Sequence, residues 1–140
     1  MMYFHFAGNN EAELAGNHSD WTDLMQALLS GTYLFPLSEE IAPYPYDHTG
    51  KLIRIDLVDD ANISKPIGRF YTDHDTLVFL GTVDDVNWLT AQIAAMLGAP
   101  PGTHFHIDVI SFSERLVDNT LDLVFHLNGA AGGRGEEGPQ

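Results

Sequence analysis

Cysteine is absent from the 140-residue chain and basic residues are scarce, with six Lys and Arg against 20 Asp and Glu. The lack of cysteine excludes disulfides, thiolate metal sites and cysteine nucleophiles. A net charge of −14 argues against binding to nucleic acid, whose phosphates require a basic surface, and against an anionic membrane surface. No apolar run reaches the roughly 18 residues that a membrane-spanning helix needs. We therefore expect a cytoplasmic chain with neither a nucleic-acid nor a membrane partner.

The chain also lacks the sequence templates of common enzymes. It has no GxSxG nucleophile elbow, no GxxxxGK[ST] phosphate loop and no GxGxxG after a strand. Its paired acids, such as Asp59-Asp60 and Asp84-Asp85, are adjacent in sequence, so on a strand or helix their side chains point apart. We therefore expect no catalytic residue and no cofactor.

Length and composition predict one domain. A chain of 140 residues, of which 44% are hydrophobic, is long enough to bury a core of its own. The last dozen residues, GAAGGRGEEGPQ, are too rich in glycine to fold. The predicted organisation is a single domain over residues 1–128 followed by a flexible tail over residues 129–140.

Hydrophobic periodicity predicts two helices. The apolar residues between positions 21 and 28 recur at helical spacing, which indicates a helix over roughly residues 20–30 that Asp20 caps. A capping box of Thr82 and Asp85 begins a second helix, and Gly98 with two following prolines ends it.

Six short apolar segments are typical of strands. They cover residues 3–7, 51–58, 68–72, 76–80, 104–112 and 121–128. The segments around residues 8–19 and 34–50 are expected to be loops. Short turns favour antiparallel pairing, so the predicted fold is α+β, with a single mainly antiparallel sheet of about six strands and both helices on one face. The element order also allows two β-α-β-β units, and whether these are a duplication stays open.

Histidines gather on the two strands that are nearest the C-terminus. His104 and His106 share one face of their strand because side chains alternate, and His126 lies on the next strand. If the two strands form a hairpin closed near Phe112 and Thr120, His106 is directly opposite His126. Such a cluster is suited to zinc, iron or nickel. The alternative is a polar face in solvent, where histidine is tolerated.

Four consecutive segments of the C-terminal half have a familiar pattern: the strand TLVFLGT, the helix NWLTAQIAAML, the Gly-x-His-x-His strand GTHFHID and the strand LDLVFHL. Together, over residues 76–128, they resemble small immunity proteins of bacterial polymorphic toxin systems. The resemblance implies a cytoplasmic inhibitor that binds and neutralises a cognate toxin domain and performs no catalysis. An acidic inhibitor fits a basic nuclease toxin. The competing hypothesis is a small metal-binding protein or metal-dependent enzyme that uses the histidine cluster.

Candidate partner-binding residues combine negative charge with aromatic side chains. They lie in two acidic turns and in one loop that contains prolines: Asp59, Asp60, Asp73, Asp75, Tyr44, Tyr46 and Asp47. Tyrosine offers a large contact area at little cost in entropy, and proline stiffens its neighbours. The alternative is that Tyr44 and Tyr46 cover the edge of the sheet or the core.

Overall fold

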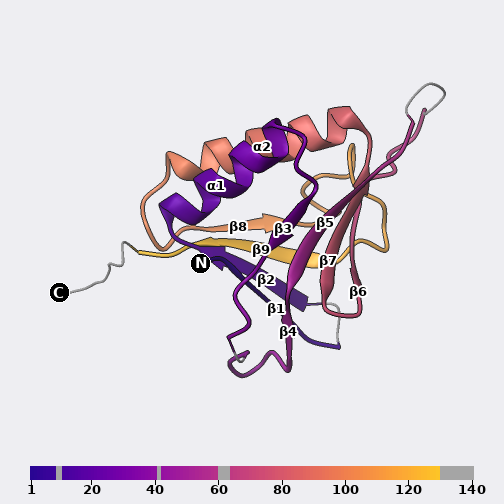
Figure 1. Ribbon diagram of the computed structural model, residues 1–140. Coiled ribbons are helices and arrows are strands. Elements are labelled where there is room, and N and C mark those ends of the chain that lie inside the picture. The colour runs from indigo at the N-terminus through magenta and orange to yellow at the C-terminus, as the bar shows by residue number, and fades with distance from the viewer. Residues whose placement is uncertain (9–10, 41, 60–63, 130–140) are drawn as a thin grey trace.

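The computed structural model describes residues 1–8, 11–40, 42–59 and 64–129 of the chain (Figure 1). Its fold is α+β, as the sequence predicts, but the strands form two sheets of five and four strands. The prediction of a single six-stranded sheet is therefore wrong. Most strand pairs are antiparallel, but each sheet contains one parallel pair at its centre.

We call the larger sheet A and the smaller sheet B. Sheet A has the spatial order β4 (His48–Gly50), β1 (Tyr3–Phe6), β2 (Glu11–Gly16), β9 (Asp122–Leu127) and β8 (His104–Ile107). Sheet B has the order β3 (Leu34–Pro36), β5 (Leu52–Leu57), β7 (Thr76–Gly81) and β6 (Arg69–Asp73). The two helices are α1 (His18–Leu29) and α2 (Val83–Leu97), and they lie side by side across one side of the molecule (Figure 1).

The chain consists of two topologically equivalent halves that exchange strands. The first half runs β1-β2-α1-β3-β5 and the second runs β6-β7-α2-β8-β9, with β4 inserted between β3 and β5. In sheet A, β2 of the first half pairs in parallel with β9 of the second. In sheet B, β7 of the second half pairs in parallel with β5 of the first. This exchange explains why two sheets form, because each half completes its hairpin with strands of the other.

Both helices begin with a capping box. Asn17 accepts a hydrogen bond from the backbone N–H of Asp20, and Asp20 accepts one in return from the backbone N–H of Asn17, both at 2.9 Å. Thr82 and Asp85 make the same pair of bonds at 3.1 and 2.9 Å. The second box was predicted. In the first, Asp20 occupies the third helical position and Asn17 is the cap, because the helix begins two residues earlier than predicted.

A glycine precedes each capping residue, and it is needed for close approach. A Cβ atom at Gly16 would lie 2.7 Å from Cβ of Asp20, and one at Gly81 would lie 2.8 Å from Cβ of Asp85. Any other residue would force the helix away from the strand that leads into it. Each glycine therefore allows a strand to turn directly into a helix.

A single hydrophobic core lies between the helices and the inner faces of both sheets. Trp21 of α1 is fully buried, and its ring lies 4.8 Å from that of Phe125. Phe125 of sheet A also meets Phe70 of sheet B edge-on at 6.4 Å, so the two sheets share this core. Within the described part of the chain, no helix combines the length and apolar character needed to cross a membrane.

Several predicted boundaries differ from the structure. The segment after residue 8 contains β2, and the proline-rich segment before Gly50 contains the short strands β3 and β4, although loops were expected. The strand predicted over residues 104–112 ends at Ile107. Most of the predicted C-terminal tail lies outside the described residues.

The segment between β8 and β9 is not a hairpin turn, because it leaves sheet A and meets the edge of β6. The backbone N–H of Phe70 donates to Oγ1 of Thr120 at 2.8 Å, and the N–H of Leu121 donates to the carbonyl of Phe70 at 2.9 Å. These bonds satisfy part of the edge of sheet B. The β8–β9 register is therefore set by this detour and not by a tight turn near Phe112.

Candidate functional site

The outer face of sheet A, which points away from the helices, carries acidic and histidine side chains. One row across the strands follows the register Tyr3, Ala15, His126 and His104. The next row is His5, Glu13, Val124 and His106. The small side chain of Ala15 leaves Glu13 as the neighbour of His126 on β2.

Glu13, His104 and His126 form a compact cluster on three adjacent strands. Each offers one nitrogen or oxygen atom, and these atoms all lie within 4.8 Å of one another. Nδ1 of His126 is 3.2 Å from Oε2 of Glu13, and the rings of His104 and His126 stack with centroids 4.0 Å apart. The side chains of Glu13 and His126 are 18% and 24% exposed, so this pair is shielded from much of the solvent.

The register corrects the predicted metal cluster. His104 lies opposite His126, whereas His106 lies opposite Val124, which is a shift of two residues from the predicted pairing. Two of the three predicted residues, His104 and His126, therefore come together, and the third member is Glu13. No sequence signal pointed to Glu13, because β2 was expected to be a loop and its parallel partner β9 is more than 100 residues away.

A covering segment from the loop before β4 lies over one side of this face. His5 is only 2% exposed, and its Nε2 is 3.3 Å from the carbonyl oxygen of Glu40. The ring of Tyr46 lies 6.4 Å from that of His5. Burial raises the pKa of the Tyr46 phenol, and the negative charges of Glu13 and Glu11 raise it further. Tyr46 is thus a partly buried neighbour of the acidic face, which agrees with the alternative in which it covers the sheet.

A hollow of about 220 Å³ adjoins the cluster on the same face. Glu11, Tyr46, His106, Asp108 and Asp122 are among the residues that line it. Acidic and imidazole groups therefore continue beyond the three-residue cluster toward the other end of β8 and β9.

Positive charge is distributed unevenly between the sheets. None of the five strands of sheet A contains Lys or Arg, and the first 50 residues of the chain contain none. Sheet B contains Arg54 on β5 and Arg69 on β6. Arg54 binds Asp56 through Nε at 2.9 Å and Asp73 through Nη1 at 3.4 Å. The strands of sheet A therefore offer the acidic groups of its outer face histidine, as in the pair of His126 and Glu13, but no Lys or Arg.

The predicted partner-binding residues do not form one surface. Asp75 lies 3.6 Å from Nζ of Lys51 at the start of β5, whereas Asp59 follows the end of that strand. A six-residue strand separates these ends by roughly 20 Å. Hydrogen bonds from His74 and Arg54 lower the pKa of the Asp73 carboxyl. Asp73 and Asp75 are thus paired with cations of the chain itself.

Tyr44 and Asp47 lie in the loop before β4 and are both exposed. Tyr44 is 96% exposed, so it does not cover the core, in contrast to Tyr46. Asp60 lies outside the described residues.

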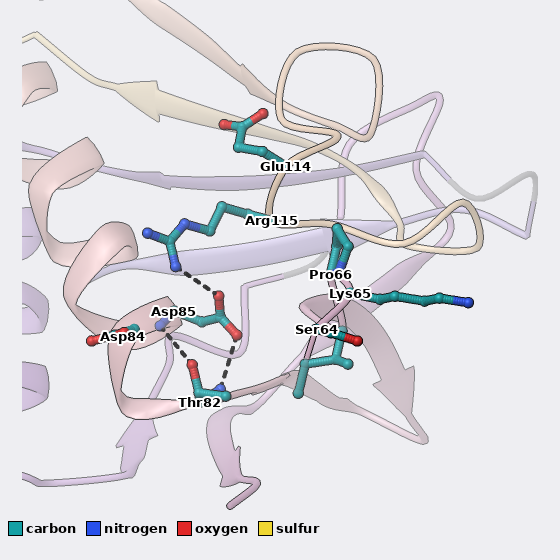
Figure 2. A pocket seen from close by; sticks show the side chains of 9 residues that line it. Ser64, Lys65, Pro66, Thr82, Asp84, Asp85, Glu114 and Arg115 are labelled. Atoms are coloured by element: carbon teal, nitrogen blue, oxygen red, sulfur yellow. Dashed lines mark hydrogen bonds and ion pairs between the residues drawn. The ribbon is translucent and has the colours of Figure 1, made fainter. Parts of the chain in front are cut away.

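A second hollow, of about 320 Å³, lies at the N-terminus of α2 (Figure 2). Its floor carries the Thr82 and Asp85 capping box, and Nη1 of Arg115 lies 3.3 Å from Oδ1 of Asp85. Asp85 already binds the backbone N–H of the cap, and its charge is balanced by Arg115. The arrangement is therefore explained by helix capping.

The chain was also compared with known proteins. No protein-family model matches it, and neither the curated proteins nor the solved structures contain a match.

Proposed function

We propose that the protein is an acidic cytoplasmic inhibitor of the immunity type, which binds and neutralises a cognate toxin domain with a basic surface. The observation that carries this proposal is the charge of the outer face of sheet A. This face presents Glu11, Glu13 and Asp122 on strands that contain no Lys or Arg. The inhibitor function also agrees with the resemblance of residues 76–128 to immunity proteins.

Sheet B differs from sheet A in its balance of charge. There, Asp56 and Asp73 bind Arg54, so the negative field of the chain is partly cancelled close to its source. On sheet A no Lys or Arg of the strands reduces the negative field, which accelerates encounter with a basic partner. A basic nuclease has a phosphate-binding cleft of the complementary charge.

Aromatic side chains beside this face favour a protein partner. Tyr44 is 96% exposed and lies two residues from Tyr46, which lines the hollow on sheet A. Exposed tyrosines at the border of a charged face often become anchors of protein interfaces. The loop before β4 and the outer face of sheet A together form the proposed docking surface.

The proposal is tested by co-expressing the full chain with the toxin domain encoded beside its gene. Asp122→Lys reverses one charge on the docking surface, and Asp23→Lys makes the same change at an exposed position on α1. We expect the wild type and Asp23→Lys to rescue growth. Asp122→Lys should slow association with the purified toxin domain on the order of tenfold, because steering depends on local charge.

If the wild type does not rescue growth in the presence of the toxin domain, the inhibitor function is rejected. Equal association rates for the two variants would reject sheet A as the docking surface. The inhibitor function would then depend on another surface of the chain. Raising the salt concentration should reduce the wild-type association rate more than that of Asp122→Lys.

A further inference from the structure

We propose that Glu13, His104 and His126 bind one zinc ion on the outer face of sheet A. The cluster contains two imidazoles and one carboxylate, which are ligand types that zinc uses in proteins. The site lies on the same face as the proposed docking surface and shares Glu13 with it, but zinc binding needs only groups of this chain and no partner.

The three ligand atoms are close to the positions that zinc requires. Ligands 2.0–2.1 Å from a tetrahedral ion are roughly 3.4 Å from one another. The atoms of the cluster lie within 4.8 Å of one another, so side-chain rotations that bring them closer by up to about 1.4 Å close the site. His104 is exposed, so its ring can rotate out of its stack on His126, whereas Glu13 and His126 are already in contact at 3.2 Å.

The backbone that carries the cluster is rigid. His126 lies on β9, which has β2 on one side and β8 on the other, so the three ligands come from three neighbouring hydrogen-bonded strands. The indole N–H of the buried Trp21 donates to the carbonyl oxygen of His126 at 2.9 Å, which anchors the central strand at the ligand itself. Sites on strands hold their geometry better than sites on loops.

The surrounding charge favours a cation. The strands of sheet A contain no Lys or Arg, and Glu11 and Asp122 lie on the same face as the cluster. The imidazoles of His104 and His126 stack with an interplanar angle of 21°, so their in-plane nitrogen lone pairs converge on one ion once the His104 ring rotates out of the stack. Three protein ligands leave one position of a tetrahedral ion open to water.

His106 is the matched control for His104. Both are exposed histidines on β8 and both lie on the outer face, but His106 is opposite Val124 and is not part of the cluster. Zinc binding that depends on this geometry must therefore distinguish between the two residues.

The experiment titrates zinc chloride into the untagged full chain by calorimetry and follows cobalt binding by its visible absorption. We expect one equivalent to bind to the wild type and to His106→Ala with the same affinity. His104→Ala and Glu13→Gln should each weaken binding by at least about 100-fold, the upper end of what the loss of an outer-sphere partner costs. Cobalt bound to the wild type should show the intense absorption of a four-coordinate site.

His104→Ala changes an exposed side chain and Glu13→Gln keeps the shape of the carboxylate, so both variants should retain the wild-type circular dichroism spectrum. Absence of one-equivalent binding to the wild type would overturn the proposal. So would a loss in His106→Ala as large as that in His104→Ala, or full affinity in Glu13→Gln. Because no toxin is present, none of these outcomes depends on the inhibitor function.

Discussion

In sheet A, the six residues of β2 pair in parallel with the six residues of β9, and the ladder ends where Gly16 meets Leu127. In sheet B, the six residues of β7 pair in parallel with the six of β5, and the ladder ends where Gly81 meets Leu57. A capping box follows each glycine directly. The two halves thus share their backbone plan down to single residues.

The outer faces of the two sheets differ at equivalent positions. Val124 on β9 corresponds to Arg54 on β5, since the two residues occupy the same step of the two parallel ladders. Arg54 binds Asp56 and Asp73, whereas Val124 lies beside Glu13 and His106 and offers them no charge. Backbone plan and core are therefore shared, while the exposed chemistry is specific to each sheet.

The largest expected effect is on the free energy of unfolding, at two equivalent core positions. These are Trp21 and Val86, each of which lies four residues after the capping residue of its helix. Trp21 is fully buried, contacts Phe125 and donates a hydrogen bond to His126. Trp21→Ala should lower the free energy of unfolding by about 3–5 kcal/mol, because it leaves a large cavity. Val86→Ala removes much less volume and should cost less. Urea unfolding of both variants measures the difference, and equal costs would contradict a special role for Trp21 in joining the halves.

An intermediate effect is expected at the two capping-box aspartates. The side chain of Asp85 is 8% exposed and pairs with Arg115, whereas that of Asp20 is 17% exposed and lies 3.5 Å from the N-terminal amino group. Asp85→Ala leaves the backbone N–H of Thr82 without its acceptor and should cost about 1–3 kcal/mol. Asp20→Ala should cost less, since its site is more open to water. Thermal unfolding of the two variants tests this order. A greater loss of stability in Asp20→Ala than in Asp85→Ala would contradict it.

The smallest effect is expected at the surface ion pairs of sheet B. Arg54→Val copies the residue of sheet A and should change the free energy of unfolding by less than about 1 kcal/mol, because exposed ion pairs contribute little. The same variant should raise the pKa of Asp73, which hydrogen bonds from His74 and Arg54 lower in the wild type. Carboxyl NMR titration follows that change, with Asp118 as an exposed reference.

The sign of the associated pH dependence follows from the lowered pKa of Asp73. A carboxyl whose pKa is lower in the folded state stabilises the fold above its unfolded pKa, and this contribution is lost as the pH falls through the folded pKa. Arg54→Val should therefore lose slightly less stability than the wild type on acidification below about pH 4. If the titration of Asp73 is the same in Arg54→Val as in the wild type, His74 alone lowers the pKa of Asp73.

Local sequence signals predicted the parts of the fold that depend on neighbours in the chain. The Thr82 and Asp85 box, the helix after it and the turn at His74 are all present, because each is determined within a few residues. The α+β class was also predictable from the order of apolar segments. The strand β2 was missed because its acidic residues alternate with small apolar ones, a pattern that also occurs in polar loops.

Long-range pairing was not predictable. Whether β5 joins β1 or β7 depends on which hairpin edge it meets, and no local pattern encodes that choice. The prediction that His106 lies opposite His126 was wrong for the same reason. The segment 108–121 runs to β6, and the β8–β9 register differs by two residues from the predicted one. Glu13 entered the candidate site only once β2 was placed beside β9.

The exchange of strands between the halves has a consequence for how the chain folds. The β1–β2 hairpin is synthesised early, yet its parallel partner β9 follows more than 100 residues later. Sheet A therefore cannot close until β9 has also left the ribosome. Contacts of such long sequence separation make folding slow, because a large loop must close before its contacts form. During that interval the edge of β2 is exposed, and the negative charges of Glu11 and Glu13 keep it from pairing with other nascent chains.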